Sequence, residues 1–349
     1  MSARNMGLKA AAYMALGAIG LVMAVPLAWM ISTSLKDPSQ VMVANDRWLP
    51  RRQVMSKYGP VYATAVDGVA VRGTQVARSP RGRTLRLLEP AAMAGRTVTV
   101  AASKVRPVEQ VHLHWGNYAA AWSAIKVESA FGGLLRNADA FLIFYINSIL
   151  VAVAVTLGQV FTSSLAAYAF ARLRFPGRDS LFLGYLATLM VPAVITMIPV
   201  YILLSRLRLT DSYWALILPA MFSAYGTFML RQFFLTIPRD LEDAARIDGA
   251  GLFTIYWRII MPLSKPALAA LTTFIFLHTW NEFMWPLIVI DSLQLKTLPI
   301  GLAHFQGPYA TEWHLLMAAS VIVMVPVLLV FIAGQRYFVR GIILSGIKG

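Results

Sequence analysis

Long apolar blocks constrain this chain more than any other feature, because each is long enough to cross a lipid bilayer. A transmembrane helix needs about 20 predominantly apolar residues, and only helices or closed barrels satisfy all their backbone hydrogen bonds inside lipid. Six blocks meet the length requirement, at residues 10–31, 141–173, 180–204, 213–234, 266–290 and 315–338. The sequence therefore predicts an all-α polytopic membrane protein with six transmembrane helices.

Composition supports this class. Hydrophobic residues make up 58% of the chain and charged residues 13%, whereas soluble domains carry about 25% charged residues. The net charge of +15 would indicate nucleic acid in a soluble protein, but in a membrane protein basic loops that face anionic lipid explain it better. The chain has no cysteine, so neither a disulfide scaffold nor a thiolate metal site is possible. No metal site is predicted.

Residues 37–140 have a different composition, rich in Arg, Gly, Val and Thr, and contain no block that could span. Two alternating apolar runs flank Asp67-Gly68, which predicts a β-hairpin with a two-residue turn. We expect further short strands after it, in RTLRLL and RTVTVAA, and a surface helix and loop over 119–140. His112 and His114 alternate on a predicted strand, but two histidines alone are weak evidence for a metal.

These patterns predict three parts. Residues 1–36 form the N-terminus and first transmembrane helix, and residues 37–140 an extracytoplasmic loop with a small β-rich insert at about 49–111. Residues 141–349 form a core with five helices. A cleaved signal peptide is the alternative for the first block, but its apolar core would be about 7–15 residues. Placing most short basic loops inside puts both termini in the cytoplasm.

The most polar run in the C-terminal two thirds of the chain lies at residues 238–263, between two apolar blocks, and is called the hook below. Pro238 suits the start of a helix, and Asp240, Glu242 and Asp243 follow it in the first turn, where the helix dipole favours negative charge. Gly249 suits the end of that helix. One predicted face of the helix collects positions spaced i, i+3, i+4, i+7: Leu241, Ala244, Ala245 and Asp248.

A second short helix is predicted after the glycine. Its members Phe253, Tyr256, Trp257 and Ile260 are spaced to share one face, and Pro262 is expected to end it. The alternative interpretation of the whole run is a solvated loop with incidental helix.

The hook resembles the signature cytoplasmic loop of the membrane subunits of ABC importers. The matching residues are Glu242, Asp243, Ala244, Ala245, Asp248, Gly249, Ala250, Ile259 and Pro262. Asp243 stands where the family signature has Glu, and Met261 stands where Leu is commoner. In that family the loop is the coupling helix, which docks in a groove of the ATP-hydrolysing subunit.

Other stretches resemble the carbohydrate-uptake permeases of the maltose-transporter type in particular. They are PLAWMISTSLKD at the end of the first block, Asn117-Tyr118, Asn147-Ser148, Trp280-Asn281-Glu282-Phe283 and the C-terminal end. The resemblance covers 10–36 and about 115–349. It implies a heterodimer with a second permease subunit, a dimer of ATP-binding subunits and an extracytoplasmic solute-binding protein.

Glu282 is the charge that is hardest to place, because the sequence puts it well inside the fifth block, where a carboxylate should face a cavity or a partner helix. As a translocation pathway, Asn281 and Glu282 would hydrogen-bond sugar hydroxyls, and Trp280 or Trp285 would offer an apolar stacking face. Asn147 is a further candidate. In the structural alternative, Glu282 bonds a neighbouring helix and the tryptophans form an interfacial belt.

In the second block, Ser163, Ala167 and Ala171 recur every four residues, which favours close helix packing in lipid.

No phosphate-binding loop of the Gly-x-x-x-x-Gly-Lys-Ser/Thr type is present, and we predict no catalytic residues. The chain is therefore expected not to be an enzyme and to need no cofactor of its own, with ATP and Mg²⁺ bound by the partner ATPase. Two alternatives stay open: an importer permease for a peptide or phosphorylated polyol, and a membrane-anchored protein that works through its β insert.

Overall fold

The positions of the prolines determine which of the long apolar blocks form continuous helices and which form broken ones. The computed structural model describes residues 3–41, 48–79, 82–307 and 311–345. Within them, four helical segments are long and apolar enough to cross a membrane: Ala11–Ser34, Ala140–Arg172, Tyr213–Leu235 and Trp313–Gln335. Two further pairs of helices meet the same test together but are bent, Arg178–Met190 with Ala193–Arg206 by 99° and Leu252–Leu263 with Lys265–Asn281 by 79°.

The predicted third span is therefore not one straight helix. Helix α4 (Arg178–Ala187) and a short 3-10 turn end at Met190, and α5 (Ala193–Arg206) begins after Pro192. Proline lacks an amide hydrogen and disfavours helical backbone at the residue before it. Val191 accordingly is extended, with φ −82° and ψ 119°. Pro199 is tolerated inside α5.

The fifth span, predicted over 266–290, is not one continuous helix in the structure. Helix α11 (Lys265–Asn281) ends at Glu282, which is extended, and α12 (Met284–Val289) follows. Pro286 explains the break, because a helical proline clashes with the carbonyl four residues earlier, which here belongs to Glu282. Glu282 thus lies at a helix break and not within a helix.

Contacts divide the chain into two units, Met1–Ala121 with Gly307–Val321 and Trp122–Gln306 with Ile322–Gly349. The first contains α1 (Ala3–Ser34), the start of α14 (Trp313–Ser345) and the strands between 51 and 111. At the end of α1, the Asn117 side-chain amide donates to the carbonyls of Ser34 and Lys36, both at 2.8 Å. Asn117 therefore satisfies carbonyls that a helix end leaves without partners.

The strands of the first unit are all antiparallel. A six-stranded sheet has the order β2-β3-β4-β5-β6, with β7 added on β3, and β1 pairs with β8. The bounds are β1 (Arg51–Gln53), β2 (Met55–Ser56), β3 (Gly59–Val66), β4 (Val69–Ser79), β5 (Gly82–Glu89), β6 (Thr97–Val100), β7 (Arg106–Pro107) and β8 (Glu109–Val111).

The predicted hairpin is present as β3 and β4. Asp67 and Gly68 form its turn with φ of 50° and 79°, as a two-residue turn with both central residues left-handed requires. Val71, Leu85 and Leu87 form the buried centre of the sheet. His112 and His114 lie beyond β8 and not on a strand.

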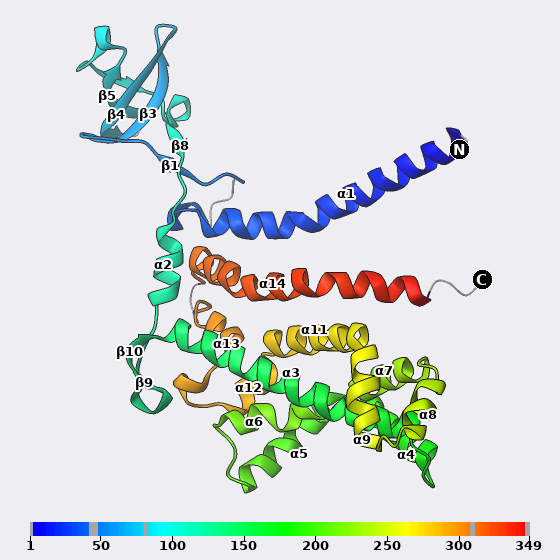
Figure 1. Cartoon of the computed structure of the whole chain (residues 1–349). Helices are drawn as coiled ribbons and strands as arrows, with labels where there is room; N and C mark the ends of the chain where they lie inside the picture. The colour runs from blue at the N-terminus through cyan, green and yellow to red at the C-terminus, as the bar shows by residue number, and fades with distance from the viewer. Residues whose placement is uncertain (1–2, 42–47, 80–81, 308–310, 346–349) are drawn as a thin grey trace. The chain divides into compact units, whose positions relative to one another are not determined.

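The second unit is built around α3 (Ala140–Arg172), which packs against α7 (Ala224–Leu235) and α11 (Figure 1). Ser163, Ala167 and Ala171 are buried on α3, as the small-residue spacing predicted. A Cβ on Gly226 of α7 would lie 2.7 Å from the Ser163 hydroxyl, so this helix contact depends on glycine.

The remaining elements of the second unit are short. They are β9 (Lys126–Ala130), β10 (Leu135–Asp139), α6 (Tyr213–Ile217), α8 (Asp240–Ile247), α9 (Leu252–Ile255), α10 (Met261–Leu263) and α13 (Leu298–Ala303), while α2 (Gly116–Ser123) leads into this unit. The β9–β10 hairpin corrects the prediction of only helix and loop over 119–140. Its register, Leu135 opposite Ala130 and Asp139 opposite Lys126, is reinforced by the Lys126–Asp139 ion pair.

Candidate functional site: the hook and a membrane-embedded cavity

The hook folds as two short helices that meet at a glycine. Helix α8 begins at Asp240, two residues after the predicted start, and the Arg239 carbonyl accepts the amides of Glu242 and Asp243 at 2.8 and 3.0 Å. Three acidic residues lie in the first turn, where the helix dipole stabilises them. Gly249 has φ 81°, a left-handed conformation that glycine adopts without strain. The first helix therefore ends where the sequence predicted.

A buried ion pair anchors the first hook helix to the core. Glu242 Oε1 lies 3.1 Å from Arg172 Nε, and the two side chains are 5% and 2% exposed. The atoms are not aligned for a hydrogen bond, so the contact is an ion pair. The Arg172 Nη2 also donates to the carbonyls of Phe234 and, at 2.6 Å, Ile237. Arg172 thereby joins the end of α3, the end of α7 and the hook.

The second hook helix is tied to α3 by two tyrosines. The Tyr256 hydroxyl lies 2.7 Å from Ser164 Oγ, and the Tyr168 hydroxyl donates to the Leu252 carbonyl at 3.2 Å. Helix α9 passes into a π-helical turn over Tyr256–Ile260, and α10 ends at Leu263, one residue beyond the predicted end at Pro262. The hook therefore contacts α3 through side chains of both its helices.

The predicted face of the second helix is split. Tyr256 and Ile260 are buried, whereas Phe253 and Trp257 are 67% and 55% exposed. The wider π-helical turn changes the angular spacing, so these four side chains do not share one face. The buried pair packs in the core, and the exposed pair is left free to contact another surface.

Several large apolar side chains are exposed along the hook. Leu241, Ile247, Phe253 and Trp257 are 45%, 88%, 67% and 55% exposed. Exposed apolar residues that cluster on a short segment mark an interaction site more often than isolated ones do. We call these four residues the hook surface.

The signature residues lie next to the hook surface in sequence and divide between exposed and core-packed positions. Asp243, Ala244, Asp248, Gly249 and Pro262 are exposed, and Ala245, Ala250 and Ile259 are half-buried and pack against the core. Among the nine matched residues, Glu242 alone is buried.

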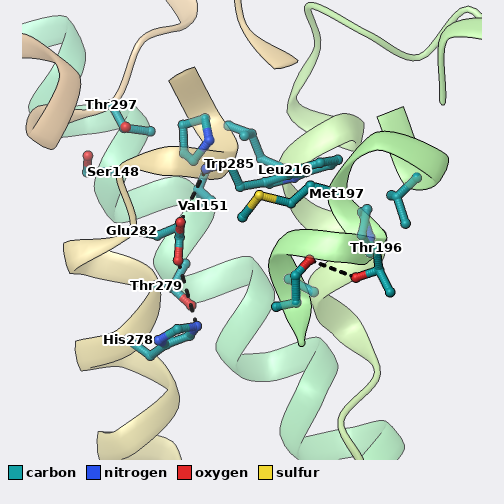
Figure 2. A pocket seen from close by; sticks show the side chains of 15 residues that line it. Ser148, Val151, Thr196, Met197, Leu216, His278, Thr279, Glu282, Trp285 and Thr297 are labelled. Carbon is teal, nitrogen blue, oxygen red and sulfur yellow. Dashed lines mark hydrogen bonds and ion pairs between the residues drawn. The ribbon is translucent and has the colours of Figure 1, made fainter. Parts of the chain in front are cut away.

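A cavity of about 310 Å³ lies in the second unit, between α3, α5, α6, α11 and α12 (Figure 2). Its wall is mainly apolar, with hydroxyl, imidazole and carboxyl groups from few positions. The lining residues are Ser148, Val151, Ala193, Thr196, Met197, Val200, Leu216, Pro219, Ala220, His278, Thr279, Glu282, Trp285, Pro286 and Thr297. Apolar walls with few fixed polar groups are typical of small-molecule sites.

Glu282 is the one acidic group among the lining residues that the structure describes. Its Oε1 accepts the Trp285 amide at 3.2 Å, and its Oε2 lies 3.8 Å from His278 Nε2. Figure 2 shows Glu282 between these two residues, with Thr196 and Met197 on the α5 side. The helix break caused by Pro286 therefore puts a carboxylate into the cavity and gives it a backbone partner.

Of the other pathway candidates, Trp285 is among the lining residues, whereas Trp280 and Asn281 are not. Trp285 lines the cavity and donates from Nε1 to the Ala215 carbonyl at 3.0 Å. Trp280 is 1% exposed and packs against Tyr145 and Phe276. Asn281 is exposed, with its side-chain amide on the Leu277 carbonyl at 2.7 Å.

Asn147 is also a core residue in this structure. Its Nδ2 donates to the Gln294 and Lys296 carbonyls, both at 2.9 Å, and its Oδ1 accepts from the Tyr213 hydroxyl at 2.6 Å. Together with Ser148, whose Oγ accepts the Leu298 amide at 2.8 Å, it fixes the segment before α13. Because Ser148 also lines the cavity, the Asn-Ser pair connects the cavity wall to this segment.

Sequence reasoning missed three contributors to this region. His278 and Thr279 precede Glu282 by one turn of α11, a spacing of i, i+3 and i, i+4 that could have signalled a shared face. Asp211 gave no signal. Its Oδ1 accepts the amides of Asp291 and Ser292 at 3.0 and 2.9 Å, and its Oδ2 accepts the Ser292 hydroxyl.

Comparison with known proteins places this geometry in a family. Residues 159–344 match the model of the binding-protein-dependent transport system inner membrane component, a range that contains the hook and most of the cavity. The chain is 39% identical over 216 residues to the arabinooligosaccharides transport system permease protein AraQ of Halalkalibacterium halodurans, covering 62% of this chain and 77% of AraQ. It is also 39% identical over 231 residues to the sn-glycerol-3-phosphate transport system permease protein UgpE of Pectobacterium atrosepticum, covering 66% and 79%.

A solved structure shares the fold. It is a bacterial ABC transporter involved in the import of the acidic polysaccharide alginate, which matches 97% of this chain and 99% of its own with a TM-score of 0.66 and 18% identity. Together these findings define a multi-pass permease of the inner membrane. The chain belongs to the family of inner membrane components of binding-protein-dependent transport systems, and the predicted resemblance to ABC-importer membrane subunits is confirmed.

Proposed function

We propose that this chain is one of two permease subunits of an ATP-driven importer for a sugar or oligosaccharide. The observation that carries the proposal is the hook, a family signature that displays an apolar surface while a buried ion pair fixes it to the core. A loop made only for connection would expose polar residues instead. The exposed hook surface would dock in a separate ATPase subunit, which binds ATP and Mg²⁺.

The chemistry of the cavity favours a neutral, hydroxyl-rich solute. Thr196, Thr279 and Glu282 offer hydrogen bonds, and Trp285 and Met197 offer apolar contact. Lys and Arg are absent from the lining residues that the structure describes. A phosphorylated polyol would need cationic partners for its phosphate and would meet the Glu282 carboxylate instead, so this alternative is less favoured even though UgpE is a relative.

We propose six crossings, with α4 and α5 counted as one bent crossing and the hook helices α9 and α10 left outside the membrane. An even number of crossings puts both termini on the same side, and the basic Arg174–Arg178 turn favours the cytoplasm for that side and for the hook. The strands between 51 and 111 would form an extracytoplasmic insert. A second permease subunit would complete the pathway, and an extracytoplasmic binding protein would deliver the solute.

The assembly can be tested by co-purification in mild detergent followed by mass spectrometry. We expect a second polytopic subunit and an ATPase with a phosphate-binding loop to co-purify with the chain. A binding protein from the same assembly, analysed for its bound ligand, is expected to carry a saccharide. Purification of the chain alone, from membranes in which ABC ATPases are present, would contradict the proposal. A phosphorylated ligand in the binding protein would overturn the sugar assignment and leave the importer assignment in place.

A further inference from the structure

A polar hollow of about 570 Å³ lies at the turn between α3 and α4, next to the residue that precedes α8. It is lined by Arg174, Phe175, Gly177, Arg178, Asp179, Ser180 and Arg239. Three guanidinium groups therefore surround one carboxylate. Neither the solute cavity nor the hook surface includes any of these residues, so the hollow is a feature of its own.

The single carboxylate does not balance these charges. Asp179 is engaged by Arg178, with Nε to Oδ1 at 2.9 Å and Nη2 to Oδ2 at 3.2 Å, and Arg231 approaches it at 3.9 Å. Arg174 and Arg239 are exposed, and neither has an acidic partner within 4.0 Å in the described part of the chain. The guanidinium groups of Arg174 and Arg239 can therefore bind an anion that is not part of this chain.

The surroundings of the hollow indicate what kind of anion fits. Leu181 and Leu183 on α4 are 60% and 66% exposed, and α4 belongs to a segment apolar enough to enter a membrane. At 1.5 Å per residue, Leu181 lies only about 4.5 Å along the helix axis from Arg178. Charged side chains and exposed apolar side chains therefore meet within one helical turn.

We propose that this hollow binds the phosphate of an anionic phospholipid headgroup, with the acyl chains lying along α4. Guanidinium groups bind phosphate oxygens in a bidentate geometry, and Arg174 and Arg239 reach the hollow from two different segments, the α3–α4 turn and the residue before α8. The Ser180 hydroxyl is a further donor. Free inorganic phosphate shares the same chemistry but gains nothing from Leu181 and Leu183.

Occupancy would also connect the lipid to the hook. Arg239 immediately precedes α8, and its carbonyl accepts the amides of Glu242 and Asp243. A headgroup held between Arg174 and Arg239 therefore joins the α3–α4 turn to the first turn of the hook. The site lies beside the Arg172–Glu242 ion pair and uses different residues.

The test is lipid binding to the intact transporter purified in detergent, measured by native mass spectrometry. Phosphatidylglycerol, phosphatidylcholine and inorganic phosphate are titrated separately against the wild type and an R174Q/R239Q variant. Each basic side chain near an anionic lipid surface contributes roughly five-fold to affinity, so we expect the variant to bind phosphatidylglycerol about 25-fold more weakly. Phosphatidylcholine binding should stay unchanged.

A matched control removes two exposed arginines of the same unit, Arg136 on β10 and Arg206 at the end of α5. The R136Q/R206Q variant should keep the wild-type affinity for phosphatidylglycerol. Equal binding by the wild type and R174Q/R239Q would overturn the proposal. Inorganic phosphate that competes at the same concentration as phosphatidylglycerol would replace the lipid assignment with a free phosphate site. Loss of the co-purifying ATPase without any change in lipid binding would instead assign the arginines to a protein contact.

Discussion

Arg172 connects more of the structure than any other residue in the hook region. One guanidinium group reaches the hook through Glu242 and the end of α7 through the Phe234 and Ile237 carbonyls. Both charged side chains are almost fully buried, so each depends on the other for compensation. The pair connects the hook to the α3–α7 contact. If one partner moved away, the other charge would be left buried and unpaired.

Removing one partner should therefore cost more than removing both. We predict that Arg172→Met lowers the free energy of unfolding by about 3–5 kcal/mol, since it leaves the Glu242 carboxylate buried and uncompensated. The double variant R172M/E242L should recover much of that loss. Thermal or denaturant unfolding of the purified complex measures both. A double variant less stable than R172M would show that the ion pair itself is not the source of the effect.

Asp211 gives a pH dependence at the residue scale. Burial acts to raise the pKa of its carboxyl group, but hydrogen bonds from Ser292 and from the Asp291 amide outweigh it and hold the pKa below the ordinary value of 3.8. The stabilisation is therefore fully present above pH 3.8 and is lost as the pH falls through the lower folded-state pKa. We predict that Asp211→Asn is less stable than the wild type at pH 5–8, and that the difference narrows below about pH 4. A constant difference across this range, measured by unfolding midpoints, would contradict the assignment.

At the scale of elements, the breaks within the helices were harder to predict from the sequence than the helices themselves. Apolar length was enough to locate the continuous spans, and the turn chemistry of Asp67-Gly68 was enough to locate a hairpin. The bend angles and the position of Glu282 could not be predicted, because they depend on which proline the surrounding packing lets break a helix. Pro192 and Pro286 each break a helix, whereas Pro199 is accommodated within α5. The burial of Trp280 and Asn147 depends on partners from distant segments, which local sequence does not reveal.

The break at Glu282 makes a prediction of its own. Replacing Pro286 by alanine removes the clash with the Glu282 carbonyl and restores an amide hydrogen, so α11 can continue into α12 and turn Glu282 away from the cavity. We expect solute uptake to fall at least 10-fold while the unfolding midpoint stays the same or rises. Pro199→Ala, within the continuous α5, is the control and should leave uptake close to wild type. Normal uptake in the Pro286→Ala variant would show that the break is not needed for transport.

At the scale of the whole molecule, the strands between 51 and 111 form a β-rich part of a chain whose relatives align over 62–66% of its length. Gln53 and Glu109 are directly opposite partners of β1 and β8. Residues 54–108 can therefore be replaced by an Asn-Gly turn that closes a short hairpin. We predict that the shortened protein still assembles and retains reduced but measurable uptake. If the shortened protein assembled but had no uptake activity, the insert and not the permease core would carry the function of the protein.

In the proposed assembly, the hook surface would receive the motion of a separate ATPase and pass it to the membrane helices. Ile247 is 88% exposed, so Ile247→Asp should not disturb folding, and it would place an unpaired charge in any apolar groove that receives it. Ile247→Leu keeps the apolar area and is the matched control.

The direct measurement is ATP hydrolysis and solute uptake, made together on complexes reconstituted in liposomes. We predict that Ile247→Asp reduces uptake at least 10-fold, consistent with an unpaired charge costing more than about 1.4 kcal/mol, and that hydrolysis no longer responds to loaded binding protein. Ile247→Leu should behave as the wild type. Uptake and stimulated hydrolysis that are both unchanged in Ile247→Asp would contradict the account.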